Sequence, residues 1–218
     1  MDLRRPGRVD ASLNELEALA RKAARGAGLP WGLAEDAGWA VRWLEARELP
    51  AATLLAHWLD RRPRSTPVPQ RDKGIWTGGN GPLCPLVTGP MLADRAETEC
   101  IVAAVAAPLL LAPFAAAIAL ARSRALELAW EGALVRLAVD GEGCQVEGPA
   151  LAAETTAAVS LHPASAAVQP GRRRPKRPQP PAEVWRRLEA LAARTYAPPD
   201  PARTGDAGED DPTSAGRF

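Results

Sequence analysis

The stretch GAGLPWGLAEDAGWAVRWL, residues 26–44, joins two helical segments and contains the pattern on which the fold depends. Its glycine-rich start, residues 26–28, is typical of a helix end, and the proline that follows cannot continue a helix. A second helix is predicted over residues 32–48, because apolar residues recur there at helical spacing. Trp39 and Trp43 lie on a different face from this apolar stripe. We therefore expect this helix to lie between a helical bundle and a sheet, with polar residues that border an enclosed hollow.

Two further helices flank this stretch and complete the predicted N-terminal bundle. Ser12 and Glu15 have the spacing of a capping box, so a helix is expected to start there and to end at the glycines. A third helix is expected to begin near Pro50 and to end before Arg61. The short connections between the three helices are typical of a bundle.

In the second half of the chain, apolar residues alternate with polar ones instead of recurring at helical spacing. The alternating segments are separated by turn residues, which predicts β-hairpins. Strands are expected at residues 126–130, 135–139, 144–146 and 157–161. Because helices come first and strands follow, the predicted fold class is α+β. The expected architecture is an N-terminal helical bundle packed on an antiparallel sheet, with a C-terminal helix and a disordered tail.

The segment Ile101–Ala121 carries no charge and is long enough to span a bilayer. Pro108 and Pro113 oppose a single membrane helix, and two short apolar elements can imitate one long one. We predict a buried strand at about residues 101–105, then a helix from Pro113 to about Ser123, and no membrane contact. A membrane-tethered adaptor is the weaker alternative.

Changes in composition divide the chain into predicted regions. A long loop rich in glycine and proline follows the bundle and leads to a short helix from Thr88. Prolines and cations at residues 172–177 predict a solvated linker. The predicted regions are an N-terminal helical region (1–62), an α+β core (63–168), a Pro/Arg linker (169–181), a C-terminal helix (182–197) and a disordered tail (198–218).

The overall charge excludes some classes of partner. The 218 residues include 27 basic and 26 acidic ones, a net charge of +1, so no global field favours nucleic acid. Three cysteines and two histidines are too few and too scattered for a structural metal site or a disulfide framework. No apolar leader follows the first residues, so we expect a cytoplasmic protein. We also expect neither a metal nor a cofactor.

The second helix carries the first candidate site. Glu35 and Arg42 lie beside Trp39 and Trp43, so an aromatic wall could meet one charge of each sign. Such a pocket suits a small zwitterionic or planar ligand. The alternative is that the indoles fill the core and the charges bridge neighbouring elements.

Cysteine and tyrosine side chains supply the other candidates. Cys84 lies in a glycine-proline loop, and His57 or His162 could act as its base in a nucleophilic site; the alternative is a small buried side chain. Arg194 and Tyr196 follow the last helix. They are expected to contact a ligand or to pin the C-terminal segment to the sheet.

Several short motifs resemble those of a bacterial family known only as a domain of unknown function. The similar segments are spread over most of the chain. They are residues 12–15, 26–28, 31–32, 34–35, 42–44, 81–86, 108–111 and 193–198. The tail matches weakly, and the resemblance implies no activity.

These observations favour an accessory protein that binds a small molecule or a protein partner without catalytic apparatus of its own. The alternative is a small-molecule enzyme that uses Glu35 and Arg42 with Cys84 or Tyr196. The sequence leaves open whether the protein is an enzyme.

Overall fold

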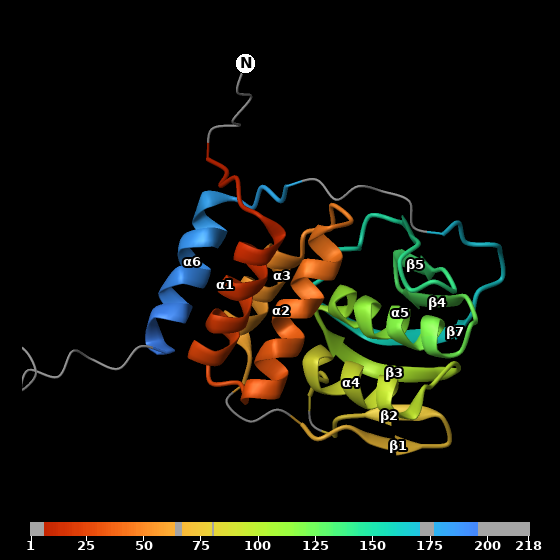
Figure 1. Ribbon diagram of the computed structural model, residues 1–218. Coiled ribbons are helices and arrows are strands. Elements are labelled where there is room, and N and C mark those ends of the chain that lie inside the picture. Colours follow the sequence, from red (N-terminus) through yellow and green to blue (C-terminus); the bar gives the residue numbers. More distant parts are fainter. Residues whose placement is uncertain (1–6, 64–66, 80, 171–176, 196–218) are drawn as a thin grey trace, which may run out of the picture.

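The computed structural model describes residues 7–63, 67–79, 81–170 and 177–195. Four helices form a bundle at one side of the molecule (Figure 1). They are α1 (Leu13–Gly26), α2 (Trp31–Glu45), α3 (Ala51–Arg61) and α6 (Ala182–Ala192), with a short 3-10 helix, η2 (Ala193–Thr195), after α6. The Ser12–Glu15 capping box is confirmed, since each residue's side chain accepts the other's backbone N–H. The predicted α+β class is also confirmed.

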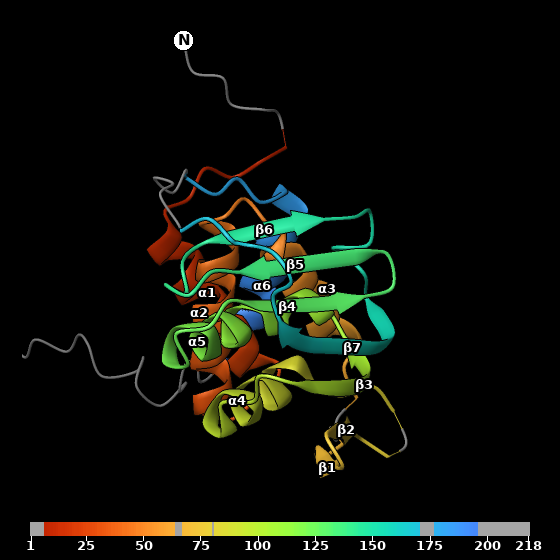
Figure 2. The same ribbon diagram turned by 90° about the vertical axis from the view of Figure 1, so that its right-hand side faces the viewer.

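A seven-stranded sheet lies at the other side, and Figure 2 views it with the bundle behind. Its order is β1-β2-β3-β7-β4-β5-β6. The strands are β1 (Gln70–Asp72), β2 (Ile75–Thr77), β3 (Cys100–Ala106), β4 (Leu126–Trp130), β5 (Ala133–Leu137), β6 (Cys144–Glu147) and β7 (Thr155–Pro163).

The sheet is mixed, which corrects the expectation of a purely antiparallel one. β2 pairs with β3 in parallel, whereas the other neighbouring strands pair antiparallel. β1 and β2 also lie inside the segment predicted as a loop. Each has only three residues, and Trp76 is the one buried residue of the six. Strands this short and exposed carry no alternating pattern by which to predict them.

The apolar segment Ile101–Ala121 divides into three elements, where a strand and one helix were predicted. β3 is followed by the 3-10 helix η1 (Pro108–Leu111) and by α5 (Ala112–Ala121). α5 contacts α2 and the strands β4 and β5, so it joins the bundle to the sheet. No helix in the described part of the chain is both long and apolar enough to cross a membrane.

Two helix boundaries differ from the prediction by about one turn. α4 (Pro85–Arg95) starts one turn earlier than expected, because Pro85 occupies its first turn and Pro90 is accommodated inside the helix. α2 ends at Glu45, and the following turn closes with Glu48 in the left-handed region at φ 62°. A proline or a short turn beside a helix leaves its exact end undetermined by sequence spacing.

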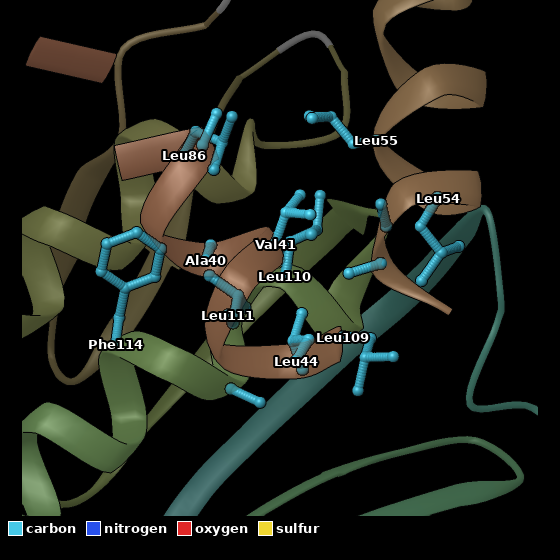
Figure 3. Close-up of a cluster of buried hydrophobic side chains, with 14 of the residues drawn as sticks. Ala40, Val41, Leu44, Leu54, Leu55, Leu86, Leu109, Leu110, Leu111 and Phe114 are labelled. Atoms are coloured by element: carbon cyan, nitrogen blue, oxygen red, sulfur yellow. The ribbon is translucent and has the colours of Figure 1, made fainter. Parts of the chain in front are cut away.

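The centre of the core is the leucine run of η1 (Figure 3). Leu109, Leu110 and Leu111 are buried. Around them gather apolar side chains of four helices, namely Val41 and Leu44 of α2, Leu54 and Leu55 of α3, Leu86 of α4 and Phe114 of α5. This cluster holds the bundle against the sheet half of the molecule.

The segments that enter and leave the bundle are paired with each other. The backbone N–H groups of Val9 and Ala11 donate to the carbonyls of Pro180 and Pro178 at 3.0 and 3.2 Å. Arg177, predicted to lie in a solvated linker, forms an ion pair with Asp10 at 2.9 Å. Residues 177–181 of the predicted linker are therefore bonded to the N-terminal segment. The rest of the cationic run, residues 172–176, and the predicted tail lie outside the described residues.

A buried carboxylate fixes the segment that crosses the outer face of the sheet. Glu127 of β4 is 3% exposed. Its Oε1 accepts the backbone N–H of Ser165 at 2.6 Å, and its Oε2 pairs with Nε of Arg136 at 2.9 Å. The bond from Ser165 is the main reason why the pKa of Glu127 lies below its usual 4.5, although burial opposes it.

We expect Glu127→Gln to lower the free energy of unfolding at pH 7 by about 1–2 kcal/mol, because the charged bonds of a buried group are lost. A carboxyl whose pKa is lower in the folded protein than in the unfolded one stabilises the fold at any pH above its unfolded-state pKa. This contribution is lost as the pH falls through its folded-state pKa. The difference between wild type and variant in urea unfolding should therefore shrink below about pH 4.5. Glu147→Gln is the control, since Glu147 pairs with the same Arg136 but is 62% exposed. If Glu127→Gln lowers the free energy of unfolding at pH 2–3 as much as at pH 7, the charged carboxylate of Glu127 is not the stabilising group.

Candidate ligand-binding cleft

Trp39 and Trp43 of α2 are packing groups at the junction between the bundle and the sheet half, whereas Trp31 at the start of the helix is exposed. Trp39 contacts the ring of Phe114 edge-on, with ring centroids 5.2 Å apart. Nε1 of the buried Trp43 donates to the carbonyl of Gly141 at 3.2 Å, and the guanidinium of Arg47 lies 3.5 Å above its ring. α2 is therefore a member of the bundle, and its main contacts outside the bundle are with α4, α5 and η1 rather than with the strands.

The two polar residues of the predicted α2 site, Glu35 and Arg42, have different surroundings. Arg42 donates to Asn14 and pairs with Glu17 at 3.2 Å, both on α1. Glu35 is exposed at the start of α2. α1 also approaches closely at Gly38, where an added Cβ would lie 2.9 Å from the carbonyl oxygen of Glu17. Arg42 therefore bridges two helices, as in the alternative that the sequence left open, whereas Glu35 is exposed.

A cleft of about 130 Å³ opens elsewhere, between the C-terminal half of α3 and the segment where β3 ends. The start of β7 and the loop before α4 complete its walls. Its lining is mostly apolar, with charged groups from α3 and from the residue before β7. The lining residues are Leu54, His57, Trp58, Arg61, Arg62, Pro63, Pro82, Cys84, Ala106, Ala107, Glu154 and Thr155.

Among the predicted site residues that the structure describes, Cys84 and its suggested base His57 line this cleft. Cys84 comes from the loop before α4 and His57 from α3. Cys84 is the N-cap residue of α4 and is only 2% exposed. Burial raises the pKa of its thiol to about 11, although the N–H groups of Val87 and Leu86 and the charge of Arg62 act in the opposite direction. The thiol is therefore neutral at physiological pH.

The charged groups of the cleft form two sets. Glu154 pairs with Arg61, and Nδ1 of His57 lies 3.8 Å from its Oε1. The bond from Arg61 lowers the pKa of Glu154. Arg62 lies apart from this set: its NH2 group donates to the carbonyl of Ala27 at 3.2 Å, and its guanidinium is 5.9 Å from the ring centroid of Trp58.

The backbone at the end of β3 is strained where it forms the cleft wall. Ala104 and Ala107 have φ of 45° and 43°, in the left-handed region that costs a residue with a Cβ on the order of 1 kcal/mol. Backbone hydrogen bonds hold this conformation. The N–H of Leu83 donates to the carbonyl of Ala104, and the carbonyl of Leu83 accepts from the N–H of Ala106. The N–H of Ala107 donates to the carbonyl of Glu154 at 2.7 Å. Strained backbone is common beside binding sites.

The remaining candidates lie away from the cleft. Nδ1 of His162 contacts the carbonyl of Pro163 at 3.1 Å, and His162 pairs in register with Glu127 on the sheet. Arg194 is exposed in η2. Tyr196 lies outside the described residues, so its predicted contacts stay predictions.

The sequence does not indicate most of the residues that line the cleft. Arg61 and Arg62 before Pro63 were interpreted as a helix end, and Glu154 falls in a turn with no pattern of its own. One sequence feature could have indicated the cleft. Trp58 and two arginines lie at the end of a predicted helix, next to the loop that contains Cys84.

Comparisons with known proteins give a family match but no activity. The fold has a distant likeness to two malate dehydrogenases, from Entamoeba histolytica (12% identity, TM-score 0.45) and from Pyrococcus horikoshii OT3 (10%, 0.47). The alignments cover 65% and 68% of this chain but only 49% and 53% of those chains, so it spans about half their length. None of the curated proteins matches the sequence. Residues 11–75, which include α1, α2 and α3, match the model of a family described as "Protein of unknown function (DUF3726)".

Proposed function

We propose that this protein is a small-molecule-binding accessory protein, and that its ligand occupies the cleft between α3 and the start of β7. The observation that carries the proposal is the composition of that cleft. Its lining includes the indole of Trp58, the neutral thiol of Cys84 and two prolines, and charged groups at the end of α3 lie at the same hollow. A mostly apolar cavity with a few convergent polar groups is the usual form of a small-molecule site.

The size of the cleft restricts the ligand. A volume of about 130 Å³ is close to the roughly 150 Å³ of an apolar cavity that holds benzene. The cleft therefore suits a molecule of about that size, or one end of a larger molecule. We also propose a cytoplasmic location, which the three unpaired cysteines support because disulfides are rare there.

An enzymatic role based on a Cys84 nucleophile has less support. Nucleophilic cysteines have a lowered pKa, whereas burial raises that of Cys84. Glu35 and Arg42, its proposed partners, are not among the residues that line the cleft.

We expect Cys84 to resist iodoacetamide at pH 7 in the native protein, because its thiol is buried and protonated. Mass spectrometry of the peptide that contains Cys84 should show alkylation only after denaturation. Native labelling within minutes contradicts this and favours the enzyme alternative.

The proposed function can be tested with a variant that fills the cleft. Thr155 is an exposed residue of β7 that lines the cleft. Thr155→Trp places an aromatic side chain in the cleft, and aromatic residues are well accommodated in strands. Ala157→Trp, exposed on the same strand but outside the lining, is the matched control.

The assay is a ligand-detected NMR screen of neutral and charged molecules of benzene size. Compounds that bind wild type and Ala157→Trp but not Thr155→Trp support the proposal. No binder to wild type, or binders that Thr155→Trp leaves unaffected, contradicts it.

A further inference from the structure

We infer that the ligand of the cleft is a small planar carboxylate, with its ring beside Trp58 and its negative group on Arg62. This inference rests on the proposed function and specifies its ligand. It follows from the charge balance of the cleft, from the partners of Arg62 and from the apolar groups that surround it.

The cleft carries an excess of positive charge. Arg61 and Arg62 contribute two positive charges, and Glu154 contributes one negative charge. Cys84 adds none, because its thiol is protonated. The local field therefore favours an anion, even though the net charge of the whole chain is only +1.

The excess is located on Arg62. Arg61 already pairs with Glu154. Among the described residues, no carboxylate forms an ion pair with Arg62, whose guanidinium contacts one backbone carbonyl and the face of Trp58. A guanidinium has five N–H donors in a planar fork that matches a carboxylate, so most of these donors remain for a ligand.

The neighbours of Arg62 favour a flat molecule. Its guanidinium lies 5.9 Å from the indole centroid of Trp58, and both groups line the same hollow. A ring attached to the carboxylate could pack beside the indole, against apolar walls formed by Leu54, Pro82 and Ala107. Apolar walls exclude water and so strengthen the contact between the two charges.

The test compares benzoate with the uncharged benzamide, which has nearly the same shape, by isothermal titration calorimetry. We expect benzoate to bind wild type roughly tenfold or more tightly than benzamide, because a hydrogen bond to a charged group is worth at least 1.4 kcal/mol. Arg62→Gln should reduce benzoate binding to the level of benzamide. Arg62→Lys should retain part of the preference, since it keeps the charge but not the fork.

Arg186→Gln is the control, because Arg186 is exposed on α6, away from the cleft. Thermal melting shows whether each variant is folded. Equal binding of benzoate and benzamide, or a preference that survives Arg62→Gln, overturns the carboxylate inference but leaves the proposed function intact. If neither compound binds wild type, the carboxylate inference fails; the proposed function fails only if the wider screen also finds no binder.

Discussion

Gly26→Ala is expected to lower the free energy of unfolding by about 3 kcal/mol, the upper part of the range for an overpacked core. Gly26 ends α1, and a Cβ added there would lie 1.8 Å from the carbonyl oxygen of Leu191 in α6. The obstacle is backbone, so no side-chain rotation can relieve it. The two helices must move apart, which separates apolar groups such as Leu188 from the bundle. Urea unfolding followed by circular dichroism measures the change.

Gly32→Ala is the matched control for this substitution. Gly32 lies in the first turn of α2, and an added Cβ would meet nothing within 4 Å. Alanine there should be neutral or stabilise the protein by up to about 1 kcal/mol, because it favours the helix. If Gly26→Ala behaves like Gly32→Ala, the close packing of α1 on α6 is wrong.

Leu110→Ala is expected to cost about 3 kcal/mol, within the usual range for a leucine truncated in a core. Leu110 is fully buried in η1, among side chains of α2, α3, α4 and α5 (Figure 3). The loss has two parts, the transfer of the removed groups to water and the cavity that remains. Since this cluster joins the bundle to the sheet half, a single cooperative transition should move to lower urea concentration.

Leu120→Ala provides the comparison at a surface position. Leu120 lies in α5 and is 58% exposed, so its truncation should change the free energy of unfolding by less than about 0.5 kcal/mol. Equal losses in the two variants contradict the position of η1 at the centre of the core.

Local patterns in the sequence predicted the elements that depend on neighbouring residues. α1 follows from the capping box of Ser12 and Glu15 and from its terminal glycines, and its bounds are confirmed. β4 and β5 follow from alternation and pair in the expected hairpin. β1 and β2 escaped prediction, because strands of three exposed residues depend on pairing with each other and with β3 rather than on an apolar face of their own.

The sequence indicates two residues of the candidate site and misses the others for a similar reason. Cys84 is predicted as a nucleophile from its glycine-proline loop, with His57 as its possible base, and both line the cleft. Glu154 and Ala107 reach it only because β7 pairs with β3 across the sheet. That pairing is a long-range contact, and no local spacing around Glu154 indicates it.

Chemical-shift mapping of the ¹⁵N-labelled protein with benzoate tests the central claim most directly, because it locates the bound molecule without prior choice of a site. The account predicts saturable shifts of the Trp58 indole N–H and of the backbone amides of Cys84, Ala107 and Thr155. The indole N–H of Trp43 should stay in place, since it donates to Gly141 away from the cleft. Shifts confined to another surface, or an unchanged Trp58 signal at saturation, would contradict the account.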